Sequence, residues 1–168
     1  MESYLTKLKH IKAFVFDVDG VFTDGKIWIM PDGELVRSMH TKDGYAVKQA
    51  VDKGFPVAVI SGANNRNIAE RFAYLGVKDV YLNALEKAGY FCDFLQHYGL
   101  SREEVAYMGD DLPDLEPMQL AGLSACPADA VREVREAADY VSPFKGGEGC
   151  VRDLIEKVLK IHGKWWGG

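Results

Sequence analysis

Short apolar runs alternate with amphipathic segments along most of this chain. Residues 11–16 (Ile-Lys-Ala-Phe-Val-Phe) form a β-branched and aromatic run that ends at Asp17-Val-Asp-Gly20, which predicts a buried strand opening into a loop. By the same criteria, strands are predicted at 11–16, 56–60, 79–82, 105–108, 123–126 and 140–141. Helical periodicity predicts helices at 44–53, 65–75, 84–98, 112–120, 129–138 and 148–161. This alternation indicates an α/β fold with a doubly wound, mostly parallel sheet covered on both faces.

The segment between the first strand and the first helix has the chemistry of a β-hairpin. The segments Lys26-Ile-Trp-Ile-Met30 and Glu34-Leu-Val-Arg-Ser-Met39 flank Pro31-Asp-Gly33, where glycine can supply the positive φ of a tight turn. We therefore predict an antiparallel hairpin over residues 26–40. Asn64 is expected to cap the helix at 65–75, and Gly99 is expected to close the helix at 84–98.

Length and composition limit the classes of protein that fit. A chain of 168 residues that is 48% hydrophobic and 27% charged, with no repeat or linker, is expected to form a single domain over 1–168. The net charge of -5 argues against binding to nucleic acid or to an anionic membrane. No apolar run has the length of a membrane span and the first residues do not resemble a secretory signal, so a cytoplasmic protein is expected. The three cysteines, Cys92, Cys126 and Cys150, are interpreted as small apolar residues.

Residues able to do chemistry gather just after predicted strands. They are Asp17, Asp19, Ser61, Lys87, Asp110, Asp111 and Asp114. Folds of this class bind ligands at the carboxyl ends of their strands, so these side chains are expected at one edge of the sheet. Several carboxylates together with a hydroxyl and a lysine favour a site for a small hard cation, with Mg²⁺ the usual choice when a phosphate completes its coordination.

These residue types meet the requirements of phosphoryl transfer. Asp17 can act as the nucleophile and form an aspartyl-phosphate, and Asp19 is close enough to give a proton to the leaving oxygen. Ser61 and backbone N–H groups around Gly62 can bind phosphate oxygens, and Lys87 can supply a positive charge.

At these residues the sequence resembles the haloacid dehalogenase superfamily. Its four signatures correspond to Asp17–Asp24, Ser61–Gly62, Lys87 and Gly109–Asp114. The resemblance implies that Asp17 is the nucleophile and Asp19 the general acid and base. It also implies that Mg²⁺ is bound by the Asp17 carboxylate, the Asp19 main-chain carbonyl and Asp110, and that phosphate is bound by Ser61, Gly62 and Lys87. Asp111 and Asp114 match supporting positions that orient the metal's water ligands and Lys87.

The gaps between these signatures hold no cap domain. The chain is similar over nearly its whole length to the capless 3-deoxy-D-manno-octulosonate 8-phosphate phosphatases, including at Lys42–Gly44, Arg71 and Gly146–Arg152. This resemblance implies a role in lipopolysaccharide biosynthesis and a homotetramer in which the hairpin at 26–40 serves in assembly and a neighbouring subunit completes each active site. It further implies that Arg71 meets the carboxylate of a sugar-acid phosphate across that interface, with Thr23 also among the substrate-binding residues.

Other interpretations remain open at this point. The nine-carbon relatives, which act on 2-keto-3-deoxynononate or N-acylneuraminate 9-phosphate, tend to carry glutamate where this chain has Ala63, which favours the eight-carbon sugar. A non-catalytic tetramerisation domain is a hypothesis of another class, against which the intact acidic residues argue. Trp165 and Trp166, in the tail at 163–168, either fray or dock against a neighbouring subunit's active site. The dispersed histidines are interpreted as surface or core residues.

Overall fold

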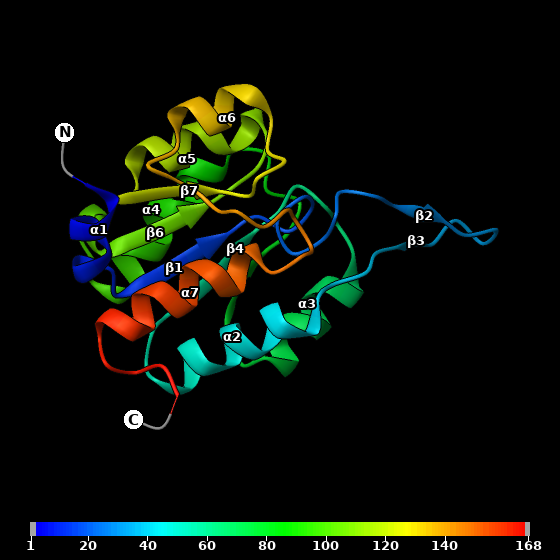
Figure 1. Cartoon of the computed structure of the whole chain (residues 1–168). Helices are drawn as coiled ribbons and strands as arrows, with labels where there is room; N and C mark the ends of the chain where they lie inside the picture. Colours follow the sequence, from blue (N-terminus) through cyan, green and yellow to red (C-terminus); the bar gives the residue numbers. More distant parts are fainter. Residues whose placement is uncertain (1–2, 167–168) are drawn as a thin grey trace.

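A central parallel sheet organises the computed structural model, which describes residues 3–166 (Figure 1). Its strands are β1 (Ala13–Phe16), β4 (Val57–Ile60), β5 (Asp79–Tyr81), β6 (Val105–Met108), β7 (Leu123–Cys126) and β8 (Tyr140–Val141). In the described part of the chain they form a six-stranded sheet of order β5-β4-β1-β6-β7-β8, in which every neighbouring pair is parallel. Strands β4 and β6 lie on opposite sides of β1, so the strand order reverses at β1, the place where such sheets bind ligands.

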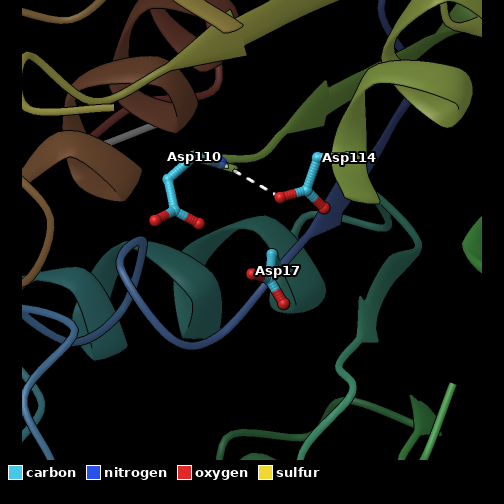
Figure 2. Close-up of side chains that lie close together, drawn as sticks. All are labelled: Asp17, Asp110 and Asp114. Carbon is cyan, nitrogen blue, oxygen red and sulfur yellow. Dashed lines mark hydrogen bonds between the residues drawn. The ribbon is translucent and has the colours of Figure 1, made fainter. Parts of the chain in front are cut away.

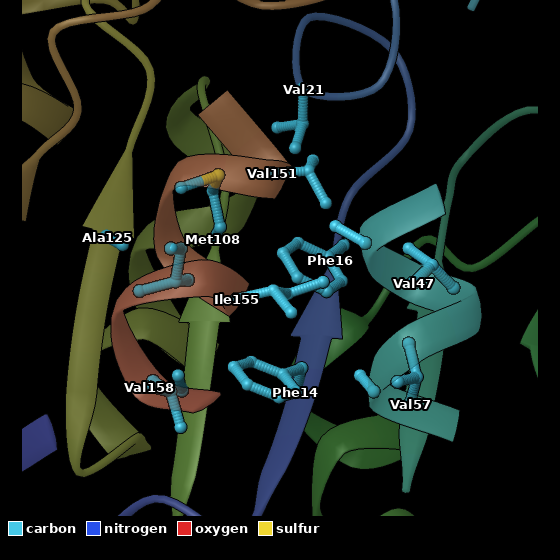
Figure 3. Packing of buried hydrophobic residues seen from close by; sticks show 14 of the residues in the cluster. Phe14, Phe16, Val21, Val47, Val57, Met108, Ala125, Val151, Ile155 and Val158 are labelled. Atoms are coloured by element: carbon cyan, nitrogen blue, oxygen red, sulfur yellow. The ribbon is translucent and has the colours of Figure 1, made fainter. Parts of the chain in front are cut away.

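Helices cover both faces of the sheet. They are α1 (Tyr4–Lys7), α2 (Thr41–Asp52), α3 (Arg66–Tyr74), α4 (Lys87–Tyr98), α5 (Leu115–Leu120), α6 (Arg132–Ala137) and α7 (Cys150–Ile161). Because side chains alternate along a strand, Phe14 and Phe16 of β1 join the core with α2, α3 and α7, whereas Ala13 and Val15 join the core with α4, α5 and α6. Figure 3 shows the first core, in which Ile155 of α7 lies beside the phenylalanine rings of β1. Burial of both faces leaves the strand ends as the place for polar chemistry.

The predicted hairpin is present and extends away from the body of the molecule (Figure 1). Strands β2 (Trp28–Ile29) and β3 (Leu35–Val36) pair antiparallel, and Gly33 in the turn between them has a φ of +85°. We call residues 26–40 the arm. Its strands pack little of their apolar surface, since Trp28 is 68% and Ile29 is 78% exposed.

The predicted fold class is confirmed, with differences at the ends of helices. Asn65, and not Asn64, caps α3, because its side chain accepts a hydrogen bond from Asn67 N at 2.8 Å. The helix predicted at 112–120 is a 3-10 turn (Leu112–Asp114) followed by α5, since the Asp114 side chain turns back onto the preceding amides. The short helix α1 and the 3-10 turn Leu8–His10 that follows it lie in a segment for which no element was predicted.

Nothing large is inserted between the elements that carry the site. Within residues 3–166, the arm and α2 separate β1 from β4, and α3 separates β4 from β5, so the capless architecture is confirmed. None of the helices in that same range has the length and apolar character needed to cross a membrane.

Candidate active site

The carboxyl ends of β1, β4 and β6 and the start of α4 surround an open cavity of about 400 Å³. Its lining includes Asp17, Asp19, Ser61, Gly62, Lys87, Asp110, Asp111 and Asp114. The structure thus brings together every predicted catalytic, metal-binding and phosphate-binding residue. They converge because each follows a parallel strand of one sheet.

Lys87 joins two of the carboxylates. Its Nζ lies 3.0 Å from Asp17 Oδ1 and 2.7 Å from Asp114 Oδ1, and all three side chains are buried. Burial opposes a charge on Lys87, but Asp17 and Asp114 outweigh it and raise the pKa of the ammonium group above its usual range. Lys87 therefore carries a fixed positive charge at the base of the cavity.

The local negative charge exceeds what Lys87 neutralises. One carboxylate oxygen from each of Asp17, Asp110 and Asp114 lies within 4.8 Å of the other two, and Figure 2 shows the three side chains. Burial, with a contribution from Asp114, raises the pKa of Asp17 to about 7, although Lys87 acts in the opposite direction. Burial, followed by the charges of Asp17 and Asp114, raises the pKa of Asp110 to about 8. A cation at this position would relieve the repulsion and hold both groups ionised.

Asp17 and Asp110 have the chemistry of metal ligands. Among the described residues, no partner hydrogen-bonds the buried Oδ1 of Asp110, and an unpaired buried carboxylate oxygen is costly. Gly20 leaves space for the same side chain, since a Cβ there would lie 1.9 Å from Asp110 Oδ2. Two converging carboxylates of this kind suit a hard cation such as Mg²⁺.

Asp114 has a different environment from the other two carboxylates. Its Oδ1 accepts hydrogen bonds from Lys87 Nζ and, at 2.8 Å, from Tyr107 Oη. Its Oδ2 accepts the backbone N–H groups of Asp110 and Asp111 at 3.1 and 3.3 Å. Asp114 therefore holds the loop after β6 and Lys87 in place. The Asp111 side chain accepts from Leu112 N and starts the 3-10 turn.

Asp19 is held by a residue that the sequence reasoning missed. Arg37, at the base of the arm, donates from Nε to Asp19 Oδ1 at 2.6 Å and from Nη2 to Asp19 Oδ2 at 3.0 Å. Only 7% of the Arg37 side chain is exposed. The available signal was a cation directly after the apolar pair Leu35 and Val36 in the returning part of the predicted hairpin.

The phosphate-binding side of the cavity is formed by the loop after β4. Ser61 is buried, and its Oγ accepts a hydrogen bond from Ala63 N at 3.2 Å. Gly62 is exposed beside it. Helix α3 begins at Arg66, one residue after the predicted start, and the loop residues Ser61 to Ala63, rather than the helix itself, line the cavity.

Two predicted substrate-binding residues do not line this cavity. Thr23 is fully buried, and its hydroxyl accepts the N–H groups of Gly20 and Gly25, each at 3.1 Å, which closes the loop after β1. Its predicted part in substrate binding stays a prediction. Arg71 lies on α3 beside a separate hollow under the arm. Its predicted contact with substrate across a subunit interface stays a prediction.

The tail packs against the body as far as Trp165. The Trp165 ring lies 6.2 Å from the Tyr45 ring, and Arg152 Cζ lies 5.2 Å from the Trp165 ring centre. Trp166 is exposed, and residues 167–168 of the predicted tail lie outside the described residues.

The chain is similar to known phosphatases along nearly its whole length. Residues 79–154 match the family model described as haloacid dehalogenase-like hydrolase. The 3-deoxy-D-manno-octulosonate 8-phosphate phosphatase of Haemophilus influenzae is 38% identical over 158 residues, covering 94% of this chain and 88% of that protein.

Solved structures show the same similarity in three dimensions. The 3-deoxy-D-manno-octulosonate 8-phosphate phosphatase of Yersinia pestis has a TM-score of 0.95 at 32% identity, covering 97% of this chain and 88% of that one. The enzyme of the same name from Moraxella catarrhalis, in complex with magnesium ion, phosphate ion and a KDO molecule, has a TM-score of 0.90 at 30% identity, covering 94% of this chain and 90% of that one.

Proposed function

Because this chain belongs to the 3-deoxy-D-manno-octulosonate 8-phosphate phosphatase family of the haloacid dehalogenase superfamily, we propose that it hydrolyses 3-deoxy-D-manno-octulosonate 8-phosphate to phosphate and the free sugar acid. The observation that carries this proposal is the cluster of Asp17, which follows β1, Lys87, which begins α4, and Asp110, which follows β6. It combines a nucleophile with a fixed cation and with a carboxylate suited to a divalent metal.

Asp17 is the proposed nucleophile. Its carboxylate attacks phosphorus as the bond from phosphorus to the sugar oxygen breaks, which leaves an aspartyl-phosphate. Lys87, Ser61 and the amides around Gly62 take the phosphate oxygens, whose negative charge Lys87 offsets. Mg²⁺, when held by Asp17 and Asp110, neutralises charge on the transferring group and keeps the nucleophile ionised.

Asp19 is the proposed general acid and base. In the first step it gives a proton to the departing sugar oxygen, and in the second it takes a proton from the water that attacks the aspartyl-phosphate. Its place two residues after Asp17, in the lining of the same cavity, supports this division of labour. Asp114 and Tyr107 support the reaction by fixing Lys87 and the loop that carries Asp110.

The substrate proposal rests on relatives and on the lining of the cavity. Ala63 lines the mouth, where the nine-carbon relatives tend to carry glutamate. Steady-state rates with the eight-carbon 8-phosphate and the nine-carbon 9-phosphates, each with and without EDTA, test the proposal. We expect kcat/KM to be highest for the eight-carbon substrate and EDTA to abolish turnover. Preference for a nine-carbon substrate would reassign the substrate, and activity unaffected by EDTA would contradict the metal site.

A test of chemistry separates an enzyme from a non-catalytic assembly domain. Asp17→Asn keeps the size of the side chain but removes the nucleophile, so we expect turnover to be lost while the fold and the assembly are retained. Light scattering and circular dichroism check the second part. Wild-type activity in this variant would contradict the covalent mechanism.

We also propose that four copies of the chain assemble through the arm and that a neighbour completes each site. Two features support this: the arm exposes Trp28 and Ile29, and the cavity is open, with Leu85 exposed at its rim. Arg71 of a neighbour would then supply a guanidinium for the sugar carboxylate. A cytoplasmic location is proposed from the free thiols of the three cysteines, which fit a reducing compartment.

A further inference from the structure

The contact between Arg37 and Asp19 links two parts of the molecule with different proposed roles. Arg37 follows β3 in the arm, and Asp19 lies in the loop after β1. In the described part of the chain, Arg37 forms the only ion pair of Asp19, whereas Lys87 pairs with Asp17 and Asp114. The two carboxylates that would carry out the chemistry are therefore held by separate cations.

The geometry of this ion pair restricts how Asp19 can turn. Two N–H groups of one planar guanidinium contact the two oxygens of one carboxylate, at 2.6 and 3.0 Å. Such a fork fixes the plane of the carboxylate as well as its position, which a single contact from a lysine does not. The pair is also shielded from water on the Arg37 side, where the side chain is almost fully buried.

The base of the arm is itself anchored to the body. Asn65 Nδ2 donates to Leu35 O at 3.0 Å, and Asn67 Nδ2 donates to Glu34 Oε1 at 2.7 Å. Both contacts come from the start of α3 and hold the returning strand just before Arg37. The position of Arg37 is thus determined at the base of the arm, although the strands beyond it are exposed.

We propose that Arg37 is a positioning residue that aims the carboxyl group of Asp19 at the departing sugar oxygen, so that the arm contributes to catalysis within its own subunit. The inference rests on the proposed function, because it requires Asp19 to act as the general acid and base. The fork takes one lone pair of each Asp19 oxygen, so the proton for the sugar oxygen is carried on the remaining lone pair of one of them. Without the fork, Asp19 would sample other rotamers, and proton transfer would lose the alignment on which its efficiency depends.

The dependence of rate on the leaving group tests this role. Departure of an alcohol from the sugar phosphate needs a proton, whereas p-nitrophenolate departs with little help. We expect Arg37→Gln to lower kcat/KM for 3-deoxy-D-manno-octulosonate 8-phosphate about tenfold to a hundredfold, and kcat/KM for p-nitrophenyl phosphate by less than about threefold. Arg37→Lys, which keeps the charge but not the fork, should fall in between.

Matched variants distinguish positioning from a loss of charge or of fold. Arg66→Gln removes the same charge from an exposed side chain that pairs with Glu70, and it should leave both rates unchanged. Asn67→Ala removes an anchor of the arm and should lower the sugar-phosphate rate in the same direction as Arg37→Gln, by a smaller factor. An equal loss with both leaving groups, or a faster reaction of the sugar phosphate in Arg37→Gln, would overturn the proposal.

A structural measurement gives an answer that does not depend on activity. A crystal structure of Arg37→Gln should show Asp19 in a different or divided rotamer, and an unchanged Asp19 would contradict the inference. A wild-type protein that hydrolyses other alkyl phosphates but not the sugar-acid phosphate would refute the proposed substrate alone. The comparison of leaving groups would then be made with the best alkyl substrate.

Discussion

Tyr107 is a residue whose polar end and apolar body have different tasks. Its ring is fully buried in β6, and its hydroxyl donates to Asp114 Oδ1 at 2.8 Å. Burial, followed by the charges of Asp114 and Asp17, raises the pKa of Tyr107 well above its usual range, so the hydroxyl remains a donor at any working pH. That hydrogen bond holds the carboxylate on which Lys87 and the loop of Asp110 depend.

Removing the Tyr107 hydroxyl should therefore affect catalysis more than folding. We expect Tyr107→Phe to cost about 1.5–3 kcal/mol of unfolding free energy, the value of a buried hydrogen bond to a charged group, and to lower kcat about tenfold. Urea unfolding and steady-state kinetics measure the two effects. Tyr98→Phe removes a hydroxyl bonded to Asp79, away from the cavity, and serves as the control. A kcat loss of equal size in both variants would show that Tyr107 acts through stability alone.

The raised pKa values of Asp17 and Asp110 predict how pH acts on the protein. An aspartate in the unfolded chain has a pKa of about 4, whereas burial raises the pKa of Asp17 to about 7 and that of Asp110 to about 8 in the folded protein. Between those pH values the folded state binds more protons than the unfolded state, so the stability of the metal-free protein should fall as pH rises. Because a metal needs both groups ionised, the affinity for Mg²⁺ should rise over the upper part of the same range.

Thermal unfolding in EDTA and calorimetric titration with Mg²⁺, at pH 5.5 and at pH 8.5, check both signs. The Asp17→Asn/Asp110→Asn double variant should show a flatter dependence of stability on pH and no Mg²⁺ binding. The assignment would be contradicted if, between pH 5.5 and pH 8.5, the stability of the metal-free wild type rose relative to that of the double variant.

At the scale of elements, the loop after β1 takes its shape from Gly20. Its φ is +84°, and a Cβ at this position would lie 1.9 Å from Asp110 Oδ2. Gly20→Ala should therefore strain the backbone by roughly 1–3 kcal/mol and push Asp110 aside. We expect Mg²⁺ affinity and kcat to fall together, by at least tenfold. Gly33→Ala, with a similar φ of +85° and no atom within 4 Å, should show the strain without the loss of metal, as measured by calorimetry.

Strands β1 and β4 and the residues after them were predictable because each of these strands is a continuous buried apolar run followed at once by a polar residue, Asp17 or Ser61. The start of α4 could not be predicted from the sequence. The predicted helix at 84–98 begins only at Lys87, since Asn83 N and Ala84 N donate to Ala63 O and Ser61 O and hold this segment as a loop. These contacts come from another element, and they place Lys87 at the cavity.

Arg37 and Tyr107 could not be predicted for a related reason. Arg37 meets Asp19 across 18 positions of sequence, through a fold that brings the base of the arm back to β1. Tyr107 looks like any aromatic residue of a buried strand, and only its hydroxyl partner shows its task. The sequence pattern thus indicated the groups that react, whereas the side chains that orient them depend on tertiary contacts.

At the scale of the whole molecule, the proposed assembly makes each site depend on two chains. Asp17 belongs to the cavity of its own chain, and Arg71 lies outside that cavity, beside the arm. If Arg71 serves a neighbour, the two residues act in the same site only when they come from different subunits. A chain lacking Asp17 and a chain lacking Arg71 should then complement one another, because a mixed assembly contains sites with Asp17 from one chain and Arg71 from the other.

We therefore expect co-expressed Asp17→Asn and Arg71→Ala chains to form mixed assemblies with activity toward 3-deoxy-D-manno-octulosonate 8-phosphate that neither variant shows alone. Arg71→Ala by itself should retain its rate with p-nitrophenyl phosphate, which has no sugar carboxylate for the guanidinium to bind. Adding Trp28→Ser and Ile29→Ser to both chains removes the exposed apolar strip of the arm, and it should abolish the recovery and reduce the assembly size in light scattering. Mixed assemblies no more active than the sum of the separate variants would place Arg71 outside the shared site.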